Sequence, residues 1–403
     1  MLRLALRNIF RQRLRTLLTV MAIATGVIAL ILSGGFVHDM FDQLAETTIH
    51  SQLGHVQIYK AGYYKQGAKE PDKYFINDLD RLKGIINNMP RIEDVMARLN
   101  FSALINNGRA DYPIIGEGLE PDKEAKLGTF ITILQGRQLN DKDRFGIVVG
   151  EGVANAQKLK PGERVTLLLN TSQGALNSLD FEVVGVFRSF SKDYDDRAVR
   201  INLTAAQELL DTKGANAIVV ALKNRSDTDA AKIWLENRLL PDQFETKAWY
   251  ELADFYKKTT DLYQREFGIL QLIILITVLL SVVNSVGMST FERIGEFGTM
   301  RAMGDRSQDI FHLVVIENVS LGIIGAAIGV VLGVLLALII SAVGIPMPPP
   351  PNMNSGYTAT ILLTPFGALS AFAVGVIGTA LACLLPARRV SRIPLIEALR
   401  ENT

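Results

Sequence analysis

The sequence predicts a membrane protein with four transmembrane helices and a large mixed α/β extracytoplasmic domain between helices one and two. Three observations predict this fold class. Uncharged apolar segments long enough to cross a bilayer occur near both ends of the chain. Every lysine lies between them, in the segment 38–266. The arginines of the remaining chain gather in short segments beside the apolar ones, as they do on one side of a membrane.

The chain opens with a predicted basic amphipathic helix over residues 1–15. Four of its arginines recur every four residues: Arg3, Arg7, Arg11 and Arg15. On a helix these side chains form one stripe. Residues 16–37 follow without a charge. At about 1.5 Å per residue they reach across a bilayer core of about 30 Å. We expect a retained first span rather than a cleaved signal peptide, whose apolar core is shorter.

Three further spans are predicted at 267–291, 311–343 and 365–386. The segment 267–291 carries no charge, and neither does the long stretch from Asn318 to Ala387. That stretch is too long for one helix, and the consecutive prolines of GIPMPPPP divide it because they cannot continue a helix. Residues 344–364 are therefore predicted to form a proline-rich loop.

The arginines predict the orientation of these spans. They occur in the N-terminal segment, in the loop 292–309 and in the tail 387–403, where Arg388 and Arg389 follow the last span. The loop 344–364 has none. Both termini and the loop 292–309 are thus predicted to be cytoplasmic, where the arginines meet membrane lipids or a partner protein. The domain 38–266 and the proline-rich loop would face outward. A formal net charge of +1 argues against nucleic acid as a partner.

The outer segment 38–266 reads as alternating strands and helices. GHVQIY, NAIVVAL and FETKAW are typical of strands, and Thr204 is predicted to cap a helix over 204–211. Residues 170–179 are predicted to be a polar loop. A helix over 250–266 is expected to continue straight into the second span, because neither Gly nor Pro occurs before Gly268.

The sequence offers few candidate catalytic or metal-binding motifs. It contains no phosphate-loop, nucleophile-elbow or zinc-protease motif, and we expect no catalytic residue, metal or cofactor in this chain. The acidic run SKDYDDR, residues 191–197, lacks the glycine and terminal glutamate of a calcium loop, so a solvated loop is favoured. The single cysteine, Cys383, excludes an intramolecular disulfide.

Small and polar residues mark the membrane segments. Four glycines of the third span predict a tight helix interface, within or between subunits: Gly322, Gly325, Gly329 and Gly333. Asn284, in the middle of span two, is expected to hydrogen-bond a neighbouring helix, with a role in lining a substrate cavity as the alternative. Glu317 is either a functional intramembrane carboxylate or part of a structural pair near the cytoplasmic interface.

The segment FERIGEFGTMRAMG predicts a short amphipathic helix that ends at Gly304. Its charged residues are Glu292, Arg293, Glu296 and Arg301, and they are interleaved with Ile294, Phe297, Met300 and Met303. Such a helix either lies on the membrane or docks into a groove of a cytosolic partner through an exposed Phe/Met face. We favour docking.

Four stretches of the sequence carry a family likeness that covers the whole chain. ERIGEFGTMRAMG resembles the segment after the second span of FtsX/MacB-type ABC transporter permeases. The stretches LRLALRNIFRQRLRTLLTVMAIATGV, IENVSLGIIGAAIGVVLG and PARRVSRIPLIEALR are similar to other segments of the same family. GHVQIYKAGYY and GIPMPPPP look most similar to its lipoprotein-releasing, LolC/LolE-like branch.

The resemblance implies a fold and partners. The outer domain would be a periplasmic module of two subdomains, in a multi-pass protein of the bacterial inner membrane. Any hook for a periplasmic carrier would be sought in 170–179. Two permease chains, alike or different, would pair with a cytosolic dimer of ABC ATPases, which bind ATP and Mg. The residues implied to couple to that ATPase are Glu292, Arg293, Glu296, Phe297, Met300, Arg301, Met303 and Gly304.

The resemblance also implies a function. ATP-driven closing of the ATPases would move the outer domain by mechanotransmission and so extract or release lipoproteins or other lipid-anchored cargo, with a periplasmic lipoprotein carrier or an adaptor as a further partner. Two alternatives remain open at this point. One is MacB-like efflux of peptides or antibiotics with an adaptor, and the other is FtsX-like regulation of a periplasmic enzyme.

Overall fold

The computed structural model describes residues 13–67, 71–128, 130–171, 174–240, 243–349, 354 and 356–393. They form two compact units. The first, here the membrane unit, comprises Met1–Phe41, Thr260–Met347 and Thr358–Thr403. The second, here the domain unit, comprises Asp42–Thr259 and Pro348–Tyr357.

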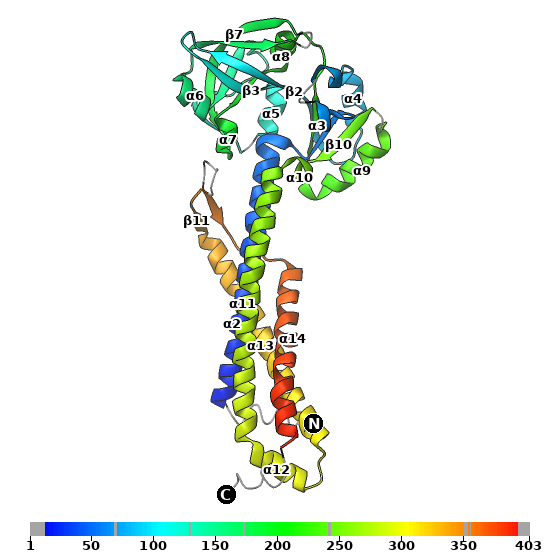
Figure 1. Ribbon diagram of the computed structural model, residues 1–403, viewed down its shortest axis with the longest axis vertical. Helices are drawn as coiled ribbons and strands as arrows, with labels where there is room; N and C mark the ends of the chain where they lie inside the picture. Colours follow the sequence, from blue (N-terminus) through cyan, green and yellow to red (C-terminus); the bar gives the residue numbers. More distant parts are fainter. Residues whose placement is uncertain are drawn as a thin grey trace. The chain divides into compact units, whose positions relative to one another are not determined.

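Four long helices build the membrane unit and lie side by side (Figure 1): α2 (Arg13–Thr48), α11 (Asp254–Glu292), α13 (Ser307–Val343) and α14 (Pro365–Ser391). All four are long and apolar enough to cross a membrane. A short helix, α12 (Ile294–Ala302), connects α11 to α13, and the strands β11 (Ile345–Met347) and β12 (Tyr357–Ala359) pair between α13 and α14. The predicted fold class is confirmed.

Two helices run further than the predicted spans. α2 continues past residue 37 to Thr48, because no Gly or Pro interrupts it there. α14 continues through Pro386 to Ser391. A proline inside a membrane helix is tolerated where neighbouring helices support the freed backbone groups. Here Ala387 and Val390, on the turn after the proline, are buried against α12 and α13, and this packing holds the helix together.

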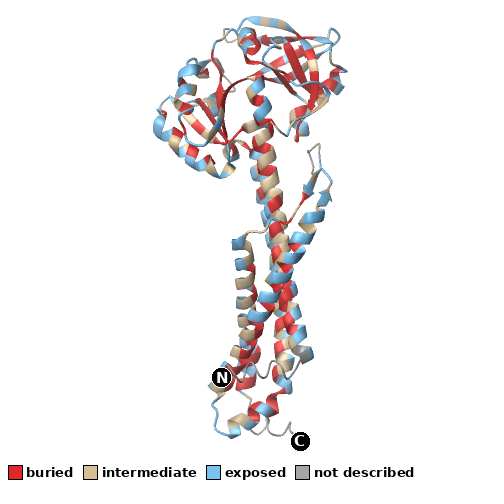
Figure 2. Ribbon diagram, turned by 180° about the vertical axis from the view of Figure 1, so that it is seen from behind, coloured by how far each residue is buried: buried red, intermediate tan, exposed pale blue. Residues whose placement is uncertain are grey.

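Small residues bring the helices of the membrane unit close together around α2. Buried residues line the inner faces of the helices (Figure 2), including Ile23 and Val27 of α2. A Cβ added to Gly26 would lie 2.4 Å from Val278 of α11, so only glycine fits at that crossing. The chain after β12 is also fastened to α2, because Thr360 donates its backbone N–H and its hydroxyl to the Asp39 carboxylate at 2.8 and 2.6 Å.

Four antiparallel strands form one end of the ten-stranded sheet of the domain unit. These strands, β1 (Val56–Lys60), β2 (Ile92–Asn106), β9 (Ala217–Leu222) and β10 (Phe244–Ala248), follow the order β10-β1-β9-β2. Between β1 and β2 lies α4 (Leu79–Ile86), and between β9 and β10 lies α9 (Thr228–Arg238). This is the split β-α-β arrangement of ferredoxin-like folds. We call it the split subdomain.

A second subdomain, here the inserted subdomain, lies in the chain between β2 and β9. Its strands are β3 (Asp111–Leu119), β4 (Thr132–Gly136), β5 (Gly146–Gly150), β6 (Arg164–Asn170), β7 (Leu176–Arg188) and β8 (Ala198–Asn202). Its helices are α5 (Pro121–Leu127), α6 (Glu151–Gln157), α7 (Lys192–Asp195) and α8 (Leu203–Leu210). Each subdomain has its own apolar core: Phe181 and Ile201 are buried in this one, Ile58 and Leu235 in the split subdomain.

Short elements complete the domain unit. A π-helical turn, η1 (Ile49–Leu53), follows α2 directly. α3 (Tyr63–Gln66) and η2 (Pro71–Tyr74) follow β1, and η3 (Arg225–Asp227) precedes α9. α10 (Trp249–Leu252) precedes α11, and Ala253 separates the two helices. The helix expected to run unbroken from residue 250 therefore begins at Asp254 and from there continues to Glu292.

Three local expectations in this unit are wrong. The polar loop predicted over 170–179 is too long, because β7 begins at Leu176 and pairs with Asn170 of β6. The cap of α8 is Asn202, whose side chain accepts from the Thr204 N–H at 3.1 Å. The acidic run 191–197 is not a solvated loop throughout, since Asp195 is buried and accepts from the Ser189 N–H at 2.9 Å.

Candidate coupling site

The turn of chain between α11 and α13 is the candidate coupling site. α12 begins directly after Arg293 and ends before Gly304. Gly304 has φ +112°, a backbone conformation that side-chain-bearing residues rarely adopt, so glycine is required to end the helix there. The predicted end of the helix at Gly304 agrees with this geometry.

A buried ion pair fixes α12 to α13. Nη1 of Arg293 lies 2.8 and 2.9 Å from the two carboxylate oxygens of Glu317. Nε of the same guanidinium donates to Glu296 at 3.0 Å, and the group lies 5.1 Å from the centre of the Phe297 ring. Both Arg293 and Glu317 are buried. Of the two interpretations of Glu317, the structure therefore favours a paired carboxylate, and its partner Arg293 directly precedes α12.

An apolar cluster joins α12 to α14 as well. Phe297 packs with Ile310 and Leu313 of α13 and with Val390 of α14, and it is only 3% exposed. Met300 is partly buried against the same cluster. The exposed Phe/Met face expected for this helix is therefore wrong for Phe297. Sequence periodicity gives the apolar stripe of a helix but not whether that stripe meets a partner or its own chain.

The surface of the turn that faces away from the bundle is short and mixed in character. Met303 is 77% exposed. The other exposed residues of the segment are Phe291, Glu292, Glu296, Thr299, Ala302, Gly304, Asp305 and Arg306. Arg301 is turned toward α14, since its Nη1 donates to the Ile393 carbonyl at 2.5 Å. Two large apolar side chains, Met303 and Phe291, among charged neighbours are the arrangement of a protein contact.

The remaining cytoplasmic-surface arginines are placed only in part. Arg388 and Arg389 are exposed on the last turns of α14. Arg3, Arg7 and Arg11 lie outside the described residues. Arg15 belongs to α2, and its side chain lies outside the described part of the structure.

The glycines of the third span lie at contacts within the chain. Added Cβ atoms at Gly325, Gly329 and Gly333 would lie 3.0, 2.8 and 3.0 Å from side-chain atoms of α2. An added Cβ at Gly322 would lie 2.9 Å from Thr379 of α14. Because glycine lets helix backbones approach closely in lipid, these positions set the spacing of α13 against α2 and α14.

Asn284 points away from the other helices of its own chain. It is exposed on α11, and Gly287, one turn further on, has no atom within 4 Å of an added Cβ. Among the described residues, the expected hydrogen bond from Asn284 to a neighbouring helix is not made. Neighbouring Ser285 instead contacts Thr19 of α2 through its hydroxyl.

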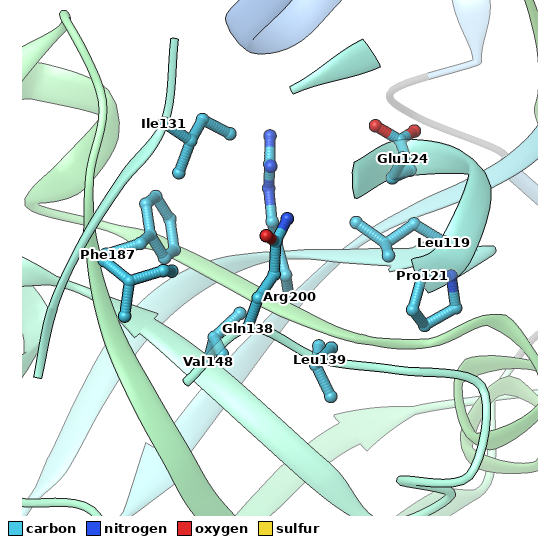
Figure 3. Close-up of a pocket in the computed structure, with 10 residues that line it drawn as sticks. Leu119, Pro121, Glu124, Ile131, Gln138, Leu139, Val148, Phe187 and Arg200 are labelled. Carbon is cyan, nitrogen blue, oxygen red and sulfur yellow. The ribbon is translucent and has the colours of Figure 1, made fainter. Parts of the chain in front are cut away.

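The cavity drawn in Figure 3, between Ile131, Leu139, Phe187 and the guanidinium of Arg200, measures only about 20 Å³. Ligand pockets typically measure about 300–1,000 Å³. A wider hollow of about 470 Å³ in the inserted subdomain is lined mostly by charged residues of both signs, Arg144 among them. Within the described part of the chain, no group of three His, Cys, Asp or Glu could hold a metal ion.

A four-helix membrane bundle with a large α/β domain after its first helix and a fastened helix between its second and third defines a permease-type membrane subunit. Residues 16–238 match the MacB-like periplasmic core domain, and residues 268–395 match the FtsX-like permease C-terminal domain. The chain belongs to the FtsX/MacB family of ABC transporter permeases. Membership in this family implies a partner ATPase.

Relatives agree with this assignment. The chain is 24% identical to an ABC transporter permease of Methanocaldococcus jannaschii over 84% of each chain. It is 23% identical to LolE, the lipoprotein-releasing system transmembrane protein of Haemophilus influenzae, over 78% of this chain and 76% of that one. It is 26% identical to the macrolide export ATP-binding/permease protein MacB of Hyphomonas neptunium, and covers 47% of that longer protein.

Among solved structures, the periplasmic region of MacB from Actinobacillus actinomycetemcomitans is similar over 53% of this chain and 94% of that one. Its identity to this chain is 14% and the TM-score is 0.37.

Proposed function

We propose that this chain is the permease subunit of an ABC transporter that extracts or releases lipoproteins or other lipid-anchored cargo from the bacterial inner membrane. A separate cytosolic ATPase would bind ATP and Mg and supply the energy. The observation that most supports this proposal is the length of α11. This one uninterrupted helix begins in the domain unit at Asp254 and ends beside the candidate coupling site at Glu292. The similarity to LolE over most of both chains supports the choice of cargo.

In this proposal α12 receives the movement of the ATPase. The exposed Met303 and its charged neighbours contact the ATPase, while the Arg293–Glu317 pair and the Phe297 cluster hold α12 to α13 and α14. A push on α12 therefore moves the ends of these helices together, since a packed interior transmits strain. α11 carries the movement outward to the domain unit. Both termini lie in the cytoplasm and the domain unit in the periplasm.

A second permease chain would complete the membrane part. Asn284 is exposed in the middle of an apolar helix, and an amide without a partner is costly in hydrocarbon. Gly287 beside it leaves room for close approach of another helix. We place the second chain, identical or homologous, against this face of α11.

The coupling contact is tested with Met303→Asp in the chain co-purified with its cognate ATPase. We expect the variant to lower the ATPase activity of the complex at least about tenfold, as loss of a buried apolar anchor at an interface does. The matched control is Val343→Asp, which places the same charge at an 83% exposed apolar position at the opposite end of α13. Unchanged binding and ATPase activity in Met303→Asp would exclude this surface as the contact.

A second candidate function is MacB-like efflux of peptides or antibiotics with an adaptor. One observation favours it. β6 and β7 pair as far as Asn170 and Leu176, so only five residues connect them where a carrier-binding hook was sought. Proteoliposomes that contain the chain and its ATPase distinguish the two functions. Release of a fluorescent lipoprotein to a soluble acceptor on ATP addition supports the proposed cargo, whereas ATP-dependent transport of a macrolide without such release supports efflux.

A further inference from the structure

The end of α2 that enters the domain unit is held by an arginine of the split subdomain. Arg225, at the start of η3, donates Nη1 to the backbone carbonyl of Asp42 at 3.1 Å. Its Nη2 donates to the Asp42 carboxylate, and Nη1 lies 3.5 Å from a carboxylate oxygen of Glu46. One guanidinium thus contacts two successive turns of the helix through three acceptors.

A second arginine reaches the continuation of the same helix from the inserted subdomain. Arg200, on β8, donates Nη2 to the backbone carbonyl of Ser51 in η1 at 3.0 Å. Its Nε lies 3.0 Å from Glu117 of β3 and 3.2 Å from the Tyr194 hydroxyl of α7. Burial alone would raise the pKa of the Glu117 carboxyl, but the guanidiniums of Arg200 and Arg98 hold that pKa below its ordinary value.

The two arginines meet the helix on different sides. Asp42 and Ser51 are nine positions apart, so at about 100° per residue the two positions lie on roughly opposite sides of the helix axis. The contacts come from different subdomains, one of which is the insertion between β2 and β9 of the other, while β2 itself pairs with strands of both. Trp249 of α10 adds an apolar contact to the same helix through Ile49.

We propose that Arg225 and Arg200 form a two-sided clamp on residues 42–53 and that this clamp fixes the two subdomains relative to each other. The Arg200–Glu117 ion pair is buried. Replacing such a pair by apolar residues often leaves the stability of a protein unchanged or improves it, so a gain in stability does not by itself explain why this ion pair is present. A planar guanidinium that binds a carbonyl and a carboxylate together fixes orientation, which a lysine cannot reproduce. Both arginines are positioning residues. The inference goes beyond the proposed function and needs no ATPase or cargo.

Hydrogen exchange on the full chain in lipid nanodiscs tests the clamp. We expect Arg225→Gln to speed amide exchange across 42–53 about tenfold, since hydrogen bonds to a charged group are lost, while β5 and β7 keep their protection. Arg225→Lys should restore only part of the protection. Arg238→Gln is the matched control, because Arg238 lies on the same subdomain, over the Trp234 ring at 4.7 Å.

The other side of the clamp requires a paired change. Arg200→Gln alone leaves Glu117 buried without its partner, so Arg200→Gln with Glu117→Gln is measured beside it. Spin labels at Asn155 of α6 and Asn237 of α9, with Cys383→Ala, report the distance between the subdomains. Each clamp variant should broaden that distance distribution, and Arg238→Gln should not. If either Arg225→Gln or the Arg200/Glu117 pair leaves both exchange at 42–53 and the distance distribution unchanged, the two-sided clamp is wrong.

Discussion

Two helices of similar length, α2 and α11, contribute residues to both units, and they differ in how much of their apolar surface the chain covers. In the most apolar stretch of α2, 39% of the residues are buried, against 11% in α11. α2 contacts α11, α13 and α14 through positions where larger residues would not fit. α11 buries Thr260, Val282, Val286 and Thr290. The comparison shows that α2 is the axis of the bundle and that α11 keeps a long face for lipid or another chain.

The largest expected effect concerns the ion pair directly after the C-terminal end of α11. Arg293→Ala leaves Glu317 buried without a partner, which we expect to cost about 3–5 kcal/mol of stability. Thermal unfolding of the purified chain in detergent measures this. The double variant Arg293→Met, Glu317→Leu should recover most of the loss, because an apolar pair replaces both charges. If the single change unfolds no earlier than the native chain, α11 is not held by this pair.

The next largest effect compares the packing of α2 with that of α11 through one glycine substitution that faces α2 and one on α11. Gly329→Ala on α13 places a Cβ 2.8 Å from Val27 and 2.9 Å from the Ala24 carbonyl oxygen of α2, so we expect a loss of about 1–3 kcal/mol from overpacking. Gly287→Ala on α11 meets nothing within 4 Å and should stabilise the single chain by about 0.5–1 kcal/mol. The same unfolding assay compares them. Equal effects of the two substitutions would contradict the difference in packing.

The smallest expected effect tests whether the exposed face of α11 around Asn284 contacts a second permease chain. Asn284→Leu removes an exposed amide from α11 and should leave the stability of the single chain unchanged. Association of two permease chains should weaken by about 1 kcal/mol, the scale of a polar contact between membrane helices. Energy transfer between labelled chains at varied protein-to-lipid ratio measures this association. Ser281→Leu, about one turn before Asn284 on the same helix, tests whether any bulky change on this face has the same result.

Charge and apolar length were sufficient to predict the spans, the position of the outer domain and the short helix before Gly304. The misses have physical causes. The periodicity around Phe297 defined an apolar face but could not show that α13 and α14 cover it. Asn284 reads as a buried amide because most of its neighbours are apolar, but in the structure it is exposed on α11. The contacts of Arg225 and Arg200 with α2 depend on strands far apart in sequence, which no local pattern indicates.

The insertion between β2 and β9 has a consequence for how such proteins diversify. These two strands are hydrogen-bonded neighbours, so the chain departs from the split subdomain and returns to it at adjacent positions. Everything from β3 to α8 can therefore be exchanged, enlarged or shortened in evolution without rethreading the split subdomain. A replacement would keep the contact with residues 42–53 only if it offered a cation where Arg200 now meets Ser51.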